Sequence, residues 1–129
     1  MAGHGLSLDL ASLERLYGRL ITEPDGVMFV SVDGAVTGAI GGFLAKACFN
    51  ENEAVAQETF WYVTPKARGS GAGRDLLEAF MQWSKAVGAT STVMATVGAP
   101  EGPTNLKLDG MYKALGFGPL ETHYFRAAR

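Results

Sequence analysis

A glycine-rich stretch in the middle of the chain constrains the fold more than any other feature. It reads Arg68-Gly69-Ser70-Gly71-Ala72-Gly73-Arg74. The extended apolar run Phe60–Val63 precedes it and the amphipathic run Asp75–Val87 follows it, so the pattern predicts a strand, a tight turn and a helix start. Glycines carry no Cβ and allow a ligand to approach the backbone closely, while the first N–H groups of a helix favour an anion. We therefore expect residues 68–74 to bind a phosphate group.

The hydrophobic pattern of the rest of the chain predicts two more helices and five strands. The helices are expected at Asp9–Leu20 and Asn105–Leu115, and the strands at Val27–Val32, Ala35–Ala47, Ala54–Val63, Thr90–Val97 and Phe117–Ala127. Asp33-Gly34 is a hairpin signal, Gly88 is expected to end the central helix, and the polar residues 49–53 are expected to form a loop. This order predicts an α/β (α+β) fold, in which helices pack on a sheet, as one domain over residues 1–129.

Composition excludes several classes of partner. The net charge of -2 gives no reason to expect nucleic acid, and no apolar run approaches the ~20 residues that cross a bilayer. Cys48 is the single cysteine, which excludes an internal disulfide and a thiolate metal cluster, and the first residues lack the pattern of a signal peptide. We expect a cytoplasmic protein without a metal site.

Two common phosphate-binding motifs do not match the glycine-rich stretch. A P-loop needs a lysine that is missing here, and a dinucleotide fingerprint begun at Gly69 would need glycine where Arg74 stands. The stretch does match Arg/Gln-x-x-Gly-x-Gly/Ala. It thereby resembles the loop with which the GNAT superfamily of N-acyltransferases binds the diphosphate of acetyl-CoA. The resemblance, from about Val27 to the C-terminus, implies a mixed, mostly antiparallel central sheet flanked by helices.

A second segment resembles the same family. Asn105, followed by Met111-Tyr112-Lys113-Ala114-Leu115-Gly116-Phe117, is similar to the pattern Asn…Phe-Tyr-x-x-x-Gly-Phe. The resemblance implies that Asn105 contacts the pantetheine or phosphate arm of coenzyme A. It also implies that the hydroxyl of Tyr112 is the general acid that protonates the leaving sulfur. A core aromatic on a short helix is the structural alternative for Tyr112.

The resemblance further implies a cofactor site that is built largely from backbone groups. The peptide groups of the strand end would pair with pantetheine, the glycine loop would hold the diphosphate, and the residue after it would add charge. The expected cofactor-binding residues are Trp61, Tyr62, Val63, Arg68, Gly69, Ser70, Gly71, Ala72, Gly73, Arg74 and Asn105.

Glu58 is the expected general base, because it lies on the strand where the family often places a carboxylate. With a period of two, Glu58 should share one face of the strand with Phe60 and Tyr62. An exposed strand glutamate is an equally good interpretation of this residue, and His123 is the other possible base.

These features together predict an acetyl-CoA-dependent N-acetyltransferase that acts directly on a primary amine. The alternatives are a non-catalytic CoA-binding regulatory or interaction module and, more weakly, a nucleotide-binding domain. Compared with the family, the chain lacks an opening strand and a first helix that help to shape the acceptor side. A partner chain could supply that wall, so a homodimer is possible.

Overall fold

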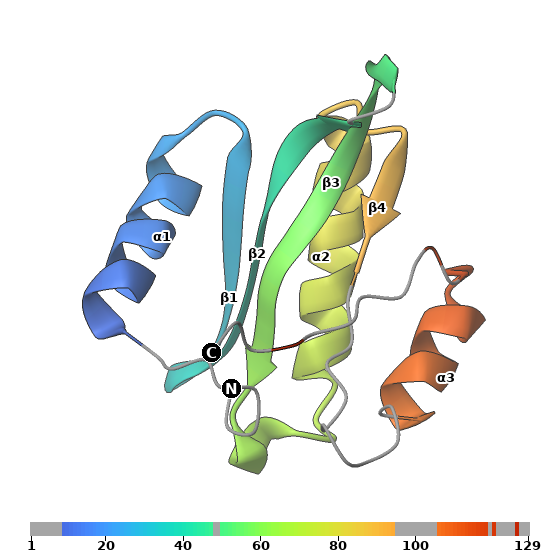
Figure 1. Ribbon diagram of the computed structural model, residues 1–129. Coiled ribbons are helices and arrows are strands. Elements are labelled where there is room, and N and C mark those ends of the chain that lie inside the picture. The colour runs from blue at the N-terminus through green and yellow to red at the C-terminus, as the bar shows by residue number, and fades with distance from the viewer. Residues whose placement is uncertain (1–8, 48–49, 95–105, 119, 121–125, 127–129) are drawn as a thin grey trace. The chain divides into compact units, whose positions relative to one another are not determined.

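The computed structural model describes residues 9–47, 50–94, 106–118, 120 and 126. Its residues form two compact units, Ala11–Met94 and the combination of Met1–Leu10 with Ala95–Arg129. The elements follow one another as α1 (Leu10–Thr22), β1 (Gly26–Asp33), β2 (Ala35–Ala47), β3 (Asn50–Val63), the 3₁₀ turn η1 (Pro65–Ala67), α2 (Ala72–Ala86), β4 (Ser91–Val93) and α3 (Leu106–Ala114) (Figure 1). Among the described residues, no helix combines the length and apolar character that a membrane span requires.

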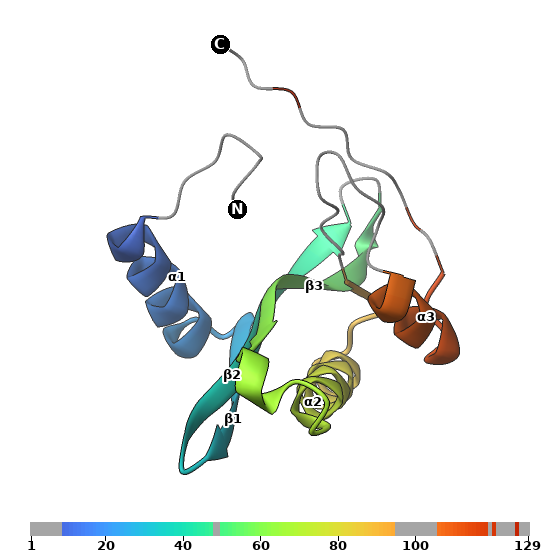
Figure 2. The same ribbon diagram turned by 90° about the horizontal axis from the view of Figure 1, so that it is seen from below.

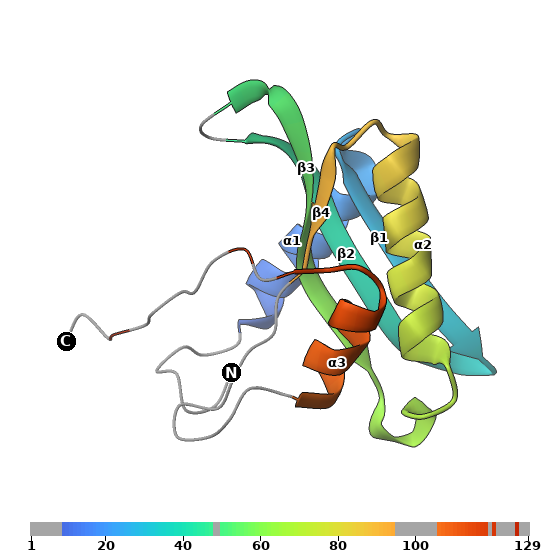
Figure 3. The same ribbon diagram turned by 90° about the vertical axis from the view of Figure 1, so that its right-hand side faces the viewer.

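The larger unit is built on one four-stranded sheet in the order β1-β2-β3-β4. The pairs β1–β2 and β2–β3 are antiparallel, whereas β4 pairs in parallel with residues Val55–Gln57 of β3. Figure 3 shows α1 and α2 on opposite faces of this sheet. The fold class expected from the sequence, a mixed and mostly antiparallel sheet with flanking helices, is confirmed.

The main core lies between α2 and the sheet. Ile40, Ala56 and Phe80 are fully buried there and Leu76 almost fully, while Trp61 and Val63 pack at its margin. Leu76 and Phe80 lie four residues apart on α2 and therefore on one face of the helix. On the other side of the sheet, Leu20 of α1 is buried and the rings of Tyr17 and Phe60 are 5.2 Å apart.

Glycines in β2 allow helices and strands to approach closely. A Cβ at Gly42 would lie 2.7 Å from Cζ of Phe80, and one at Gly41 would lie 2.6 Å from Cε1 of Phe60. Glycine at these two positions leaves room for the neighbouring side chains. The two contacts also show that Gly42 faces α2 and Gly41 faces α1, as successive strand residues must.

Local sequence signals located most element ends correctly. Gly34 turns the β1–β2 hairpin with φ of 75°. Gly88 ends α2 in a Schellman motif: its N–H donates to the carbonyl of Lys85 at 3.2 Å, and the next N–H, that of Ala89, donates to Ser84 at 3.0 Å. Gly116 ends α3 in the same way, since Phe117 donates to Tyr112 at 2.9 Å.

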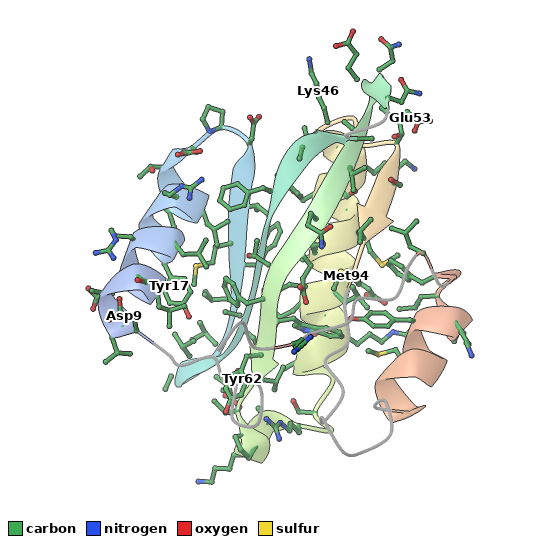
Figure 4. The ribbon with its side chains drawn as sticks, in the orientation of Figure 1. Asp9, Tyr17, Lys46, Glu53, Tyr62 and Met94 are labelled. Atoms are coloured by element: carbon green, nitrogen blue, oxygen red, sulfur yellow. The ribbon has the colours of Figure 1, made fainter. Side chains whose placement is uncertain are left out.

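Three expected elements differ from the structure. Residues Asn50–Glu53, expected in a loop, extend β3, because both faces of the hairpin tip reach water and polar side chains cost nothing there. Lys46 and Glu53 are labelled at this tip in Figure 4. The described members of the expected strand Phe117–Ala127, at positions 117, 118, 120 and 126, are not in a strand, and the others lie outside the described residues. Of the expected strand Thr90–Val97, Ser91–Val93 form β4, Thr90 and Met94 are not in a strand, and residues 95–97 lie outside the described residues.

Candidate active site and cofactor loop

A β-bulge in β3 determines which face each residue of that strand occupies. Phe60 pairs with Gly41, but Glu58 pairs with Gly42, so Thr59 is an extra residue between the two pairs. The hydroxyl of Thr59 donates to the carbonyl of Gly41 at 3.0 Å. Because cross-strand partners share a face, Glu58 faces α2 and Phe60 faces α1. The expectation that these two residues share a face is therefore wrong, since the bulge breaks the period of two.

Glu58 has an unusual protonation equilibrium for a carboxylate. It lies two residues after the fully buried Ala56 and on the same face of the strand. Burial removes water from the charged form and raises the pKa of Glu58 from 4.5 to about 7. A carboxylate with a pKa near neutral pH has the property that a general base needs. The exposed-strand interpretation of Glu58 does not fit this half-buried side chain.

The glycine loop connects η1 to the first turn of α2. Gly69 and Gly71 have φ of 86° and 94°, a left-handed conformation that favours glycine, and a Cβ at either position would meet nothing within 4 Å. Gly71 is the N-cap of α2. Figure 2 looks along α2 from the end that carries the loop. The open space beside both glycines leaves the backbone accessible to a ligand.

The first N–H groups of α2 are the anion-binding groups of this loop. Asp75 donates the first helical bond, to the carbonyl of Gly71 at 3.0 Å. Within the described residues, the backbone N–H groups of Gly71, Gly73 and Arg74 donate no hydrogen bond. The N–H of Ala72 makes a long bond of 3.4 Å to the hydroxyl of Ser70. The donor set therefore fits the diphosphate that the sequence led us to expect.

The two arginines of the loop differ in what they contact. Arg68 donates from Nε to the carbonyl of Val63 at 3.0 Å, and its guanidinium carbon lies 5.5 Å from the ring centroid of Tyr62. Arg74 forms an exposed ion pair with Glu78, with Nε and Oε1 3.1 Å apart. Neither side chain is buried, and Tyr62, whose ring Arg68 contacts, is labelled near the end of β3 in Figure 4.

The strand end presents peptide groups on alternate residues. The N–H of Thr64 donates to the carbonyl of Thr37 on β2 at 2.8 Å. Because peptide groups alternate in direction along a strand, those of Tyr62 also point toward β2, and those of Trp61 and Val63 point away from it. On that second side the described part of β4 pairs only with residues 55–57. Of the three residues expected to pair with pantetheine, Trp61 and Val63 thus have suitable peptide groups and Tyr62 does not.

The residues expected from the second motif belong to the other compact unit. Tyr112 lies in α3, is 8% exposed, and packs its ring 5.4 Å from that of Phe117. Asn105 and His123 lie outside the described residues. Gly116, the glycine of this motif, ends α3 with φ of 89°.

Sequence reasoning missed two features of this region. Thr59, the bulge residue, carries no local signal, because a threonine in a strand is ordinary. The second is a buried contact between Ser84 of α2 and Thr92 of β4, whose hydroxyl oxygens are 2.6 Å apart. Ser84 lies on the apolar face of α2 and is 2% exposed, and this position was its only sequence signal.

Comparison with known proteins agrees with the geometry. The family model described as the acetyltransferase (GNAT) family matches residues 6–117. The fold is similar to that of glucosamine-6-phosphate N-acetyltransferase from Arabidopsis thaliana, with a TM-score of 0.73 and 12% identity over 95% of this chain and 81% of that one. It is also similar to the aminoglycoside 6'-N-acetyltransferase AAC(6')-IG from Acinetobacter haemolyticus, with a TM-score of 0.68 and 19% identity over 96% and 84%.

A third similar structure contains coenzyme A. It is the aminoglycoside N-acetyltransferase AAC(6')-Iy in complex with CoA, with a TM-score of 0.68 and 20% identity over 95% of this chain and 96% of that one. A comparison with curated protein sequences finds no match. The structural likenesses establish the fold, and the family model covers most of the chain. The chain therefore belongs to the GNAT family and is an N-acetyltransferase that uses acetyl-CoA.

Proposed function

We propose that this enzyme transfers the acetyl group directly to the primary amine of a small molecule, with Glu58 as the general base. The observation that carries the proposal is the carboxyl of Glu58, whose pKa burial raises to about 7. An amine is protonated at neutral pH and must lose a proton before it can attack a carbonyl carbon. A carboxylate with a pKa close to the working pH is well matched to removing that proton, directly or through one water.

The loop and the strand end supply binding groups rather than chemistry. When bound, acetyl-CoA supplies the acetyl group as a thioester. The N–H groups of Gly71, Gly73 and Arg74 would hold its diphosphate, and the peptide groups of Trp61 and the N–H of Val63 would pair with its pantetheine arm. Asn105 is proposed as a further contact with that arm, as the family resemblance implies.

Tyr112 is proposed as the general acid. Its phenolic hydroxyl would give a proton to the sulfur as the carbon–sulfur bond breaks, while Glu58 takes a proton from the amine nitrogen. No nucleophilic side chain is needed, because the amine itself attacks. The acceptor class is proposed from the similar proteins, which are named for the acetylation of an amino sugar phosphate and of aminoglycosides.

A screen of small primary amines tests the proposal. Release of the free thiol of coenzyme A would be followed with each amine, first with aminoglycosides and glucosamine 6-phosphate. For an amine that reacts, we expect kcat/KM to rise with pH up to a plateau above about pH 7, and Glu58→Gln to abolish this dependence and lower the rate by about a hundredfold.

Two outcomes would contradict parts of the proposal. Acetyl-CoA that binds but reacts with no amine would favour a non-catalytic CoA-binding module. If Tyr112→Phe leaves kcat unchanged across the pH range, Tyr112 is not the acid. Binding of acetyl-CoA is measured by calorimetry in each variant, so that a lost cofactor is not mistaken for a lost proton donor.

A further inference from the structure

The side chain of Arg68 contacts the end of β3, although Arg68 begins the phosphate-binding motif. We propose that Arg68 is a positioning residue, which holds the glycine loop in its binding conformation through the carbonyl of Val63 and the ring of Tyr62. It does not act as a cation that neutralises the diphosphate. This inference rests on the assignment of the glycine loop to acetyl-CoA.

The first contact fixes the length of the connection between strand and loop. Nε of Arg68 donates to the carbonyl of Val63, the last residue of β3, at 3.0 Å. Two backbone hydrogen bonds within the turn η1 also stabilise this segment: the N–H of Ala67 donates to the carbonyl of Thr64 at 3.0 Å, and the N–H of Arg68 donates to the carbonyl of Pro65 at 3.4 Å. The carbonyl of Val63 points away from β2, and within the described part of the chain no sheet bond competes for it.

The second contact fixes the direction of the guanidinium group. Its central carbon lies 5.5 Å from the ring centroid of Tyr62, within the range of a cation–π interaction. Tyr62 pairs with Ala39 of β2, so its backbone is held in the sheet, and its ring is exposed on the surface where the guanidinium contacts it. The guanidinium is held at one edge by a hydrogen bond and on one face by a ring. An arginine bound in this way has given up the freedom that a long side chain normally keeps.

The loop needs such an anchor because its glycines supply none. A Cβ at Gly69 or Gly71 would touch nothing, and both residues have a backbone conformation that an unfolded glycine populates only part of the time. Ser70 makes a local contact, donating from Oγ to the carbonyl of Ala67 at 2.5 Å. Ordering each loop residue on binding costs conformational entropy. A loop that is already ordered by Arg68 binds its ligand more tightly for this reason.

Two substitutions separate positioning from charge. The side-chain N–H of glutamine is the same number of bonds from the backbone as Nε of arginine, so Arg68→Gln keeps the donor to Val63 and removes the charge. Arg68→Lys keeps the charge but puts a methylene group where the donor was. Arg68→Ala removes both. Arg15→Gln, on the exposed face of α1, removes one positive charge away from the loop and serves as the control.

The test is calorimetric titration of each variant with acetyl-CoA at low and moderate salt. If Arg68 positions the loop, Arg68→Gln binds within about threefold of the wild type, whereas Arg68→Lys and Arg68→Ala each bind about tenfold more weakly. The dependence of the dissociation constant on salt stays the same in Arg68→Gln and in Arg15→Gln. Tyr62→Leu, which removes the ring that holds the guanidinium, weakens binding about threefold.

The opposite pattern overturns the inference. If Arg68→Lys binds normally, Arg68→Gln binds weakly, and the salt dependence falls in Arg68→Gln, the arginine acts as a cation on the phosphates. If all Arg68 variants bind like the wild type, the positioning role fails while the cofactor assignment stands. If the wild-type protein binds no acetyl-CoA, both fail together.

Discussion

The half-buried carboxyl of Glu58 predicts an unusual dependence of stability on pH. Burial raises its pKa from 4.5 to about 7 in the folded state. Between these two values the folded state holds a proton that the unfolded state has released, so the free energy of unfolding falls as pH rises. The stabilisation from Glu58 is complete below about pH 4.5 and is lost as pH rises through about pH 7. Replacement by glutamine, which does not ionise, removes this dependence.

The size of the effect follows from the shift. Over each pH unit in which only the folded state holds this proton, the free energy of unfolding changes by about 1.4 kcal/mol. The difference between 4.5 and about 7 would give about 3 kcal/mol for a fully desolvated group. Glu58 is only partly buried, and water that reaches the carboxylate lowers the cost, so we expect about 1–2 kcal/mol. Relative to the wild type, Glu58→Gln should gain this amount of stability between about pH 5 and about pH 8.

Urea denaturation of the wild type and Glu58→Gln at both pH values measures the quantity directly. Titrations of other groups are common to the two proteins and cancel in the difference. Glu53→Gln, at the exposed tip of the same strand, controls for the removal of one carboxylate. The reasoning is refuted if the difference in the free energy of unfolding between the wild type and Glu58→Gln is the same at both pH values. It is also refuted if the wild type becomes more stable relative to the variant as pH rises.

Three further predictions concern packing and the loop. Gly42→Ala should lower the free energy of unfolding by about 2–3 kcal/mol, because its Cβ would collide with Phe80 and the strand backbone. Gly18→Ala, on the open side of α1, should raise the free energy of unfolding by about 1 kcal/mol. Urea denaturation measures both changes. Thr92→Val should lower the free energy of unfolding by about 1–3 kcal/mol because the buried hydroxyl of Ser84 loses its partner, and Ser84→Ala should lower it less because the hydroxyl of Thr92 is only half-buried. A double-mutant cycle that shows full additivity would contradict this. Gly71→Ala should lower the free energy of unfolding by about 1–2 kcal/mol, because alanine disfavours a backbone with φ of 94°. It should also weaken the binding of acetyl-CoA, as measured by calorimetry. Unchanged binding would show that Gly71 is not part of the cofactor site.

Sequence patterns predicted those parts of the structure that depend on neighbouring residues. Gly34 turns a hairpin and Gly88 ends a helix because a left-handed backbone is needed locally and glycine adopts it. The same reasoning applies to Gly69 and Gly71, which is why the cofactor loop could be recognised before its geometry was known. The bounds of β2 agree residue by residue, because a hairpin signal fixed its start.

What the sequence could not predict depends on contacts between distant residues. The hydroxyl of Thr59 reaches the carbonyl of Gly41, eighteen positions earlier, and the bulge exists only when these strands are paired. The contact between Ser84 and Thr92 likewise requires α2 and β4 to be in place. The side-chain direction of Arg68 depends on Tyr62 and on the end of β3, so the motif indicated a ligand without indicating what this residue contacts.

The bulge at Thr59 links the packing of the sheet to the chemistry of Glu58. Without the extra residue, Glu58 would share the face of Phe60, next to α1. With it, Glu58 stands opposite Gly42, where the ring of Phe80 fills the space that a side chain would otherwise take. Burial on the face that α2 covers removes water from the carboxylate of Glu58, which raises its pKa. The bulge thus puts Glu58 on the face where burial gives it the raised pKa on which its proposed role as a base depends.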